Sequence, residues 1–214
     1  MSLFKNLLLV CGCVSAIIYP LTDVIAGTMY KGYSFHEQAV SELFAIGSPV
    51  APFVVVFFSM SSILLFFFSL GIFLAANRNK LMILLACLVF ANALDSIILW
   101  NFFPMHMRHM APTFTDKMHT ILAINPFIVI SIIIGAFLYN NWFRSYSLFT
   151  IAALVIPAII SFSYIPLLLS HQPTPWMGIS ERISQYSHLT WLAMLSIQIF
   201  TNNSYSNNAV RKKN

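Results

Sequence analysis

Long apolar runs that carry almost no charge constrain this chain more than any other feature of its sequence. A helix crosses the hydrocarbon core of a bilayer with about 20 predominantly apolar residues, and six stretches have that length and character. They cover approximately Leu7–Gly27, Val50–Ala76, Leu81–Phe102, His119–Asn140, Ser147–Leu169 and Ile183–Thr201. Because unpaired backbone groups are costly in lipid, and no alternating strand pattern is present, these runs predict an all-α bundle of six transmembrane helices.

The composition excludes several classes of soluble protein. Of the 214 residues, 59% are hydrophobic and 8% are charged, against roughly 25% charged in an ordinary soluble domain. The net charge is +5, but the basic residues are scattered singly or in pairs, so no nucleic-acid partner is expected. We expect one membrane domain over residues 1–204, a basic Asn-rich cytoplasmic tail over 205–214, and membrane lipids as partners.

The distribution of Lys and Arg predicts the orientation, since cytoplasmic loops carry an excess of both. With a cytoplasmic N-terminus, the inner side holds Lys5, Arg78, Lys80, Arg144, Arg211, Lys212 and Lys213, and the outer side holds Lys31, Arg108, Lys117 and Arg182. This difference predicts that both termini are cytoplasmic in a multi-pass protein of the inner (plasma) membrane. The first apolar run continues well past Cys13, which favours a retained span over a cleaved signal peptide.

In this orientation, acids and histidines gather toward the outer side. All twelve lie in outer loops or in the outer parts of spans: Asp23, Glu37, Glu42, Asp95, Asp116, Glu181, His36, His106, His109, His119, His171 and His188. Two longer outer loops, residues 28–49 and 103–118, hold six of these twelve, and long polar loops often carry function. The sequence therefore predicts that the outer face is the working face.

Asp95 and His188 are the ionisable residues expected deepest in the bilayer. At 1.5 Å per residue, Asp95 lies roughly 10 Å inside the third span, where a carboxylate must be protonated, paired or hydrated. Its available partners are Arg182, Lys117 or a histidine, and a purely structural pair is one interpretation. His188, about two turns into the last span, is either a packing residue or part of the same cavity.

Three histidines and one acid around the second outer loop suggest two further possibilities. Asp116 and His119 share a helical face at this spacing, so Asp116 either orients the imidazole or stabilises the helix N-terminus. His106, His109 and His119 are candidate metal ligands, although no metal-specific spacing pattern is present. No cofactor is identified by the sequence.

The last span begins with Glu181 and Arg182, which point in different directions on a helix and so pair with different elements. Arg182 is a candidate to bind a lipid phosphate, or it is an anchor that reaches the headgroups. The four tryptophans near span ends are interpreted as interfacial belt residues.

Three separated motifs then resemble a known family. They are Gly32–Pro49 with its Ser-Glu-Leu core and Gly-x-Pro end, Phe103–His106 with Thr115–His119, and Gly178–Ile183 with Trp191. Together they resemble the bacterial multi-pass membrane family catalogued as domain of unknown function 998. Phe44 departs from the family pattern, where glycine is expected. The resemblance implies the span count and the motif positions, and it supplies no reaction.

Two hypotheses of different classes follow. In the first, a non-enzymatic protein binds a lipid headgroup or small ligand in an outer polar cavity through Arg182, Glu181, Ser41, His36 and Asp116. In the second, an intramembrane hydrolase or transferase uses His119 or His188 as general base, with Asp95 or Glu42 as orienting acid or metal ligand. In an alternative interpretation, Ser41 and Glu42 have a purely structural role, as the cap and the first turn of a short helix. Proton-coupled transport is less favoured, because the inner half holds no acid or His.

Overall fold

A computed structural model of the chain describes residues 2–108 and 110–211, and its regular elements over this range are helices. They are α1 (Ser2–Met29), η1 (Val40–Phe44, a 3-10 helix), α2 (Ala51–Ala75), α3 (Lys80–Phe102), α4 (Phe114–Ala123), α5 (Pro126–Leu138), α6 (Asn141–Ser163), α7 (Ile165–Leu169) and α8 (Met177–Arg211). The predicted all-α class is confirmed.

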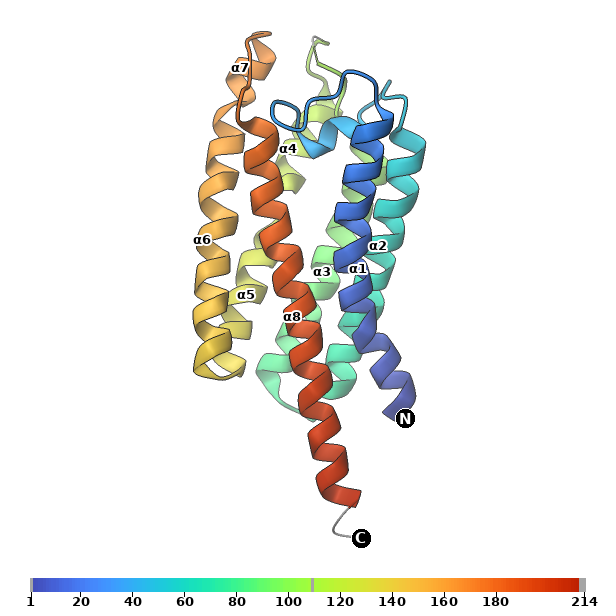
Figure 1. Cartoon of the computed structure of the whole chain (residues 1–214), viewed down its shortest axis with the longest axis vertical. Helices are drawn as coiled ribbons and strands as arrows, with labels where there is room; N and C mark the ends of the chain where they lie inside the picture. The colour runs from blue at the N-terminus through green and yellow to red at the C-terminus, as the bar shows by residue number, and fades with distance from the viewer. Residues whose placement is uncertain (1, 109, 212–214) are drawn as a thin grey trace.

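The long helices form a closed ring of neighbours. Going round the bundle, α1 packs against α2, α2 against α3, α3 against α5, α5 against α6, α6 against α8, and α8 against α1. Figure 1 shows both chain ends at one end of this bundle and the longer connections, with η1 and α7, at the other. We call the end that carries these connections the loop end.

Asparagine side chains start three of the helices. Asn79, Asn125 and Asn140 accept hydrogen bonds from backbone N–H groups in the first turns of α3, α5 and α6, which otherwise lack partners within the helix. The turn between α2 and α3 places Asn77 and Arg78 at positive φ. Such short polar turns let consecutive helices return side by side.

Five stretches within the described residues are long and apolar enough to cross a membrane. They are Leu3–Met29, Ala51–Ala75, Lys80–Phe102, Phe114–Leu138 and Asn141–Leu169. Helix α8 does not reach the same mean hydropathy, because its first half carries Glu181, Arg182 and several Ser residues. The chain is therefore a helical protein with five candidate membrane spans, and α8 packs between two of them.

The expected boundaries of the last three spans were wrong in detail. The fourth span is two helices, because Asn125 and Pro126 end α4 and start α5. The fifth begins at Asn141 and not near Ser147, so the residues expected to link the fourth and fifth spans belong to the start of α6. Helix α8 continues to Arg211, so the backbone of the expected tail is helical up to that residue.

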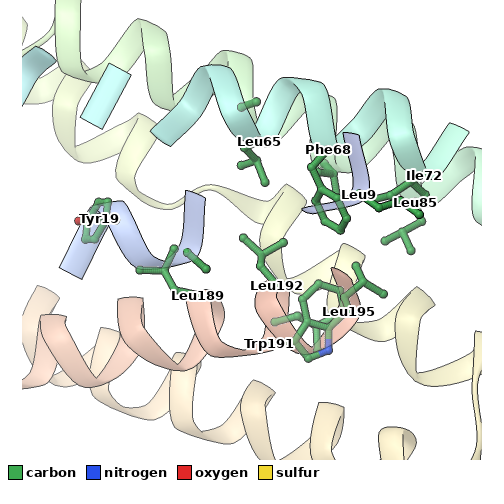
Figure 2. Close-up of a cluster of buried hydrophobic side chains, with 14 of the residues drawn as sticks. Leu9, Tyr19, Leu65, Phe68, Ile72, Leu85, Leu189, Trp191, Leu192 and Leu195 are labelled. Carbon is green, nitrogen blue, oxygen red and sulfur yellow. The ribbon is translucent and has the colours of Figure 1, made fainter. Parts of the chain in front are cut away.

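An apolar core fills the half of the bundle nearer the chain ends. Figure 2 shows side chains from four helices turned toward one another, among them Leu9, Phe68, Leu85 and Leu195. Each is completely buried or nearly so. The close packing of these side chains leaves this half of the protein interior dry.

Trp191 belongs to this core and not to an interfacial belt, which corrects the interpretation from sequence. Its side chain is 0% exposed, and its Nε1 donates a 3.0 Å hydrogen bond to the Ser147 hydroxyl. A Cβ at Gly135 would lie 2.5 Å from the indole ring. Glycine at that position of α5 therefore makes room for the large ring from α8.

Candidate functional site

The loop end is held together by a buried ion pair between α1 and α8. Arg182 donates from Nε and Nη2 to the two carboxylate oxygens of Asp23, at 2.9 and 2.8 Å. Asp23 is 0% exposed and also receives a hydrogen bond from the Tyr186 hydroxyl. This two-pronged geometry is the strong form of an Arg–carboxylate pair.

The same guanidinium binds the connection between α1 and α2. We call this connection and the one between α3 and α4 the first and second outer connections, after the side expected from the sequence. Its Nη1 donates to the carbonyl oxygens of Phe35, Gln38 and Gly178 at 2.9–3.1 Å, and its Nη2 donates to the Tyr33 hydroxyl at 2.7 Å. Burial raises the pKa of the Tyr33 phenol above its ordinary range, so the hydroxyl stays protonated and donates to the Ala39 carbonyl at 2.7 Å. Residues 33–39 are thus tied to the start of α8.

A second ion pair joins the two outer connections. Arg108 donates from Nε and Nη2 to the Glu42 carboxylate at 2.5 and 2.8 Å, and to the Glu37 carbonyl at 2.6 Å. Glu42 in η1 also accepts from the backbone N–H of Ala39 at 2.9 Å. The carboxylate therefore stabilises the first turn of η1, as the structural interpretation of Glu42 predicts. Ser41 does not serve as the cap.

Asp116 stabilises the start of α4. Its carboxylate accepts from the backbone and hydroxyl of Thr113 at 2.7 and 2.8 Å, and from the backbone and Nδ1 of His106 at 2.7 and 2.9 Å. The helix-start interpretation of Asp116 is confirmed, and the imidazole that it holds is that of His106. His119 instead lies with Nδ1 2.8 Å from the Phe103 carbonyl oxygen.

Beneath these ties lies a cavity of about 160 Å³ between α4, α6, α7 and α8. One wall is apolar and includes Ala158, Phe162 and Ile165, with the methionines of the second outer connection opposite. Polar side chains from η1, the connection between α3 and α4, α4 and α8 form another part of the lining: Ser41, His106, Arg108, Asp116, His119, Thr120, Glu181 and Gln185. We call this the outer cavity.

A smaller cavity of about 80 Å³, the inner cavity, lies deeper in the bundle. It shares Ser41, His119, Ala123, Glu181 and Gln185 with the outer cavity, so the two adjoin at these residues. Asp95 and His188 line only the inner one.

The break between α4 and α5 forms one side of the inner cavity. There Asn125 donates from its side-chain amide to Asn92 and to Asp95, both at 2.8 Å. The hydrogen-bond partner of Asp95 is therefore Asn125, whereas Arg182, Lys117 or a histidine was expected.

Several polar groups that line these cavities have no hydrogen-bond partner among the residues described. They are the side chains of Ser41, Gln185 and His188, for which no protein donor or acceptor lies in range. His188 is only 5% exposed. Since buried polar groups are almost always hydrogen-bonded, the unpartnered His188 imidazole at the inner cavity is a feature typical of a binding site.

The structure brings some of the sequence-predicted residues together and separates others. Ser41, Glu181 and His119 line both cavities, Asp95 and His188 line the inner one, and His106 and Asp116 line the outer one. Glu42, His36 and Arg182 do not contribute to either lining. His36 packs on Trp176, with ring centroids 4.6 Å apart.

The predicted metal set has a different status. His109 lies outside the described residues. Within residues 2–108 and 110–211, no group of three or more His, Cys, Asp or Glu is arranged to hold a metal ion. His106 and His119 are bound to Asp116 and to the Phe103 carbonyl, respectively.

Sequence reasoning missed Gln185, Arg108 and Asn125 as residues of this site. Gln185 had a detectable signal: Glu181, Gln185 and His188 are spaced four and three residues apart and so share one face of α8. Arg108 had none, because its partner Glu42 lies 66 positions away in the chain.

The bundle and its candidate spans define a class, that of a multi-pass helical membrane protein. Residues 13–198 match the family described as Protein of unknown function (DUF998). The chain belongs to this family, as the three sequence motifs indicated. Comparison with curated proteins and with solved structures finds no match.

Proposed function

We propose that this chain is a six-span protein of the inner membrane that binds an amphipathic, lipid-type ligand in the outer cavity. The observation that carries the proposal is the pairing of an apolar wall with unpartnered polar groups in one pair of adjoining cavities. Ligand sites are commonly concave, largely apolar, and provided with a few polar groups that fix orientation.

Helix α8 is the sixth span in this proposal. Its neighbours in the ring, α1 and α6, both belong to candidate spans, and its ionisable side chains Arg182 and His188 are buried by protein. Polar residues at membrane depth are tolerated when they face the bundle interior. An even number of spans also agrees with two chain ends at one end of the bundle, as in Figure 1.

The orientation is tested by a reporter fused to the C-terminus. The inner turns carry Arg78, Lys80 and Arg144, so a fluorescent protein that folds only in the cytoplasm should fluoresce, and a periplasmic phosphatase should be inactive. The opposite result would overturn the proposed orientation.

Lateral access from the bilayer follows from how the helices pack. Helix α4 packs against α3, and α5 packs against both α3 and α6, while the outer cavity separates α4 from α6 and α7. An acyl chain that enters between α4 and α6 would lie against Phe162, Ile165 and Leu169, with its headgroup directed toward Ser41 and Gln185.

The inner end of the site is closed by the apolar core. Leu65, Leu189 and Leu192 line the inner cavity and also belong to the buried cluster in Figure 2. This supports a site that opens only toward the outer half. Such a site suits binding, whereas a transport pathway would have to continue through the bilayer.

The test is a substitution that fills the outer cavity. Ala158→Phe projects a ring into the cavity from α6, whereas Ile159→Phe, at a neighbouring position that is 63% exposed, changes the outer surface of the same helix. Native mass spectrometry of protein in mild detergent should show lipid retained by the wild type and the Ile159→Phe control, and lost in Ala158→Phe. Equal retention in all three would contradict the proposal.

Hydrolysis of a lipid-type substrate is the second candidate function. His119 Nδ1 faces a carbonyl oxygen, which accepts only, so Nδ1 carries the proton and Nε2 is left as the basic nitrogen. Ser41 lines the same cavities as a possible nucleophile. Covalent labelling by a lipophilic fluorophosphonate that Ser41→Ala abolishes would support it, and unchanged labelling would contradict it.

A further inference from the structure

We infer that the ligand of the adjoining cavities carries an ammonium group, which Glu181 and Asp95 hold. This inference rests on the proposed function, because it specifies the headgroup chemistry of the same site.

The first step concerns the cations near the cavities. Among the described residues that line the cavities, Arg108 is the one that is a Lys or Arg. Both carboxylate oxygens of Glu42 accept hydrogen bonds from it. Arg182 directs all three of its nitrogens to Asp23, Tyr33 and backbone carbonyl groups. Neither guanidinium is left to bind a phosphate, so anion recognition has little support.

The second step concerns the acids. Asp116 is balanced by His106 and by the start of α4. Glu181, which lines both cavities, accepts one hydrogen bond from the Val40 N–H, and Asp95 accepts one from the neutral amide of Asn125. Neither carboxylate forms an ion pair within the described residues, and a carboxylate partly removed from water is costly without a cation.

Three hydrogen-bond acceptors line the same cavities as the two acids. A neutral imidazole, an amide oxygen and a hydroxyl oxygen can each accept a hydrogen bond. His188, Gln185 and Ser41 supply one of each, and none has a protein partner among the described residues. His188 is more than nine-tenths buried and lines the inner cavity beside Asp95. An ammonium group has three N–H donors and a positive charge, which satisfies both requirements at once.

Two sources present this chemistry, an aminolipid headgroup and a small soluble amine. The experiment titrates detergent-purified protein with phosphatidylethanolamine, with phosphatidylglycerol of the same acyl chains, and with ethanolamine alone, using native mass spectrometry. The variants are Asp95→Asn and Glu181→Gln, which keep an oxygen for the Asn125 and Val40 donors. Glu37→Gln, an exposed loop acid outside both linings, is the matched control.

Phosphatidylethanolamine should bind at least about tenfold more tightly than phosphatidylglycerol, the effect of one close charge pair. Asp95→Asn and Glu181→Gln should each lower its affinity about tenfold and leave phosphatidylglycerol unchanged, and Asp95→Glu should restore the preference. Equal binding of the two lipids, or no effect of either variant, would overturn the inference while the lipid-binding function stands. If ethanolamine binds, neither lipid binds, and ethanolamine affinity falls in both acid variants, the ammonium inference holds and the lipid-binding function fails.

Discussion

The buried pair between Asp23 and Arg182 permits the sharpest stability prediction. Removing one partner leaves an uncompensated buried charge, which costs about 3–5 kcal/mol. Arg182→Met and Asp23→Leu should therefore each lower the free energy of unfolding by about that amount, since Asp23 is 0% and Arg182 8% exposed. Arg144→Met, at an exposed arginine of α6, is the control and should change it by less than about 1 kcal/mol.

The double variant separates the ion pair from the other contacts of Arg182. Replacing a whole buried pair with apolar residues is often close to neutral, but here three carbonyl groups would also lose their donor, at about 1 kcal/mol each. The double variant should thus be about 3 kcal/mol less stable than the wild type, well below the sum of the single effects. Unfolding by an anionic detergent in mixed micelles, followed by tryptophan fluorescence, measures all four proteins. Additive effects, or a cost below about 1 kcal/mol for Arg182→Met, would refute the reasoning.

Three further variants test the packing around the cavities, each by the same unfolding assay. Gly178→Ala places a Cβ 2.3–2.6 Å from two backbone oxygens of the first outer connection, so it should cost about 1–3 kcal/mol and increase proteolysis of that connection; an unchanged protein would show that the connection is not held against α8. Trp191→Phe leaves the buried Ser147 hydroxyl without its donor and should cost at least about 1–3 kcal/mol, whereas Trp176→Phe, at a side chain that is 53% exposed, should cost far less. Asn125→Ala removes the cap of α5 and a donor to Asp95, so a loss of about 1–2 kcal/mol is expected, and a neutral effect would mean that the helix break is stable without it.

The placement of the first five apolar stretches could be predicted because length and hydropathy decide them locally, whereas the sixth expected stretch does not reach the same hydropathy in the structure. The break at Asn125 could not be found in this way, since averaging over 20 residues conceals a single capping residue. The Asn-Pro pair itself was a readable signal, because both residues favour a helix start. Hydropathy alone likewise misses that Arg182 of α8 is paired with Asp23 of a neighbouring helix.

The candidate site was predictable as a set of residues but not as a set of pairs. Residues of one helix face, such as Glu181 and His188, could be grouped from their spacing. Arg182 was given a ligand-binding role that stays a prediction, whereas its pairing with Asp23 depends on which helices are neighbours. The two residues are 159 positions apart, and no local pattern carries that information.

The position of the two cavities supports the loop end as the place of the proposed binding. The cavity-lining side chains Ser41, Gln185 and His188 and the two acids lie toward the loop end. Below them lies a cluster in which Phe68, Leu85 and Trp191 are almost completely buried. An ion or proton that passed from Asp95 to the far side would have to cross this cluster, whose buried members among the described residues include no Asp, Glu, His, Lys or Arg. Opening it would expose several large side chains at once, each at about 1.5–3 kcal/mol. Binding or chemistry at the outer face needs no such opening, and the closed core then serves to hold α1, α2 and α8 rigidly beneath the cavities.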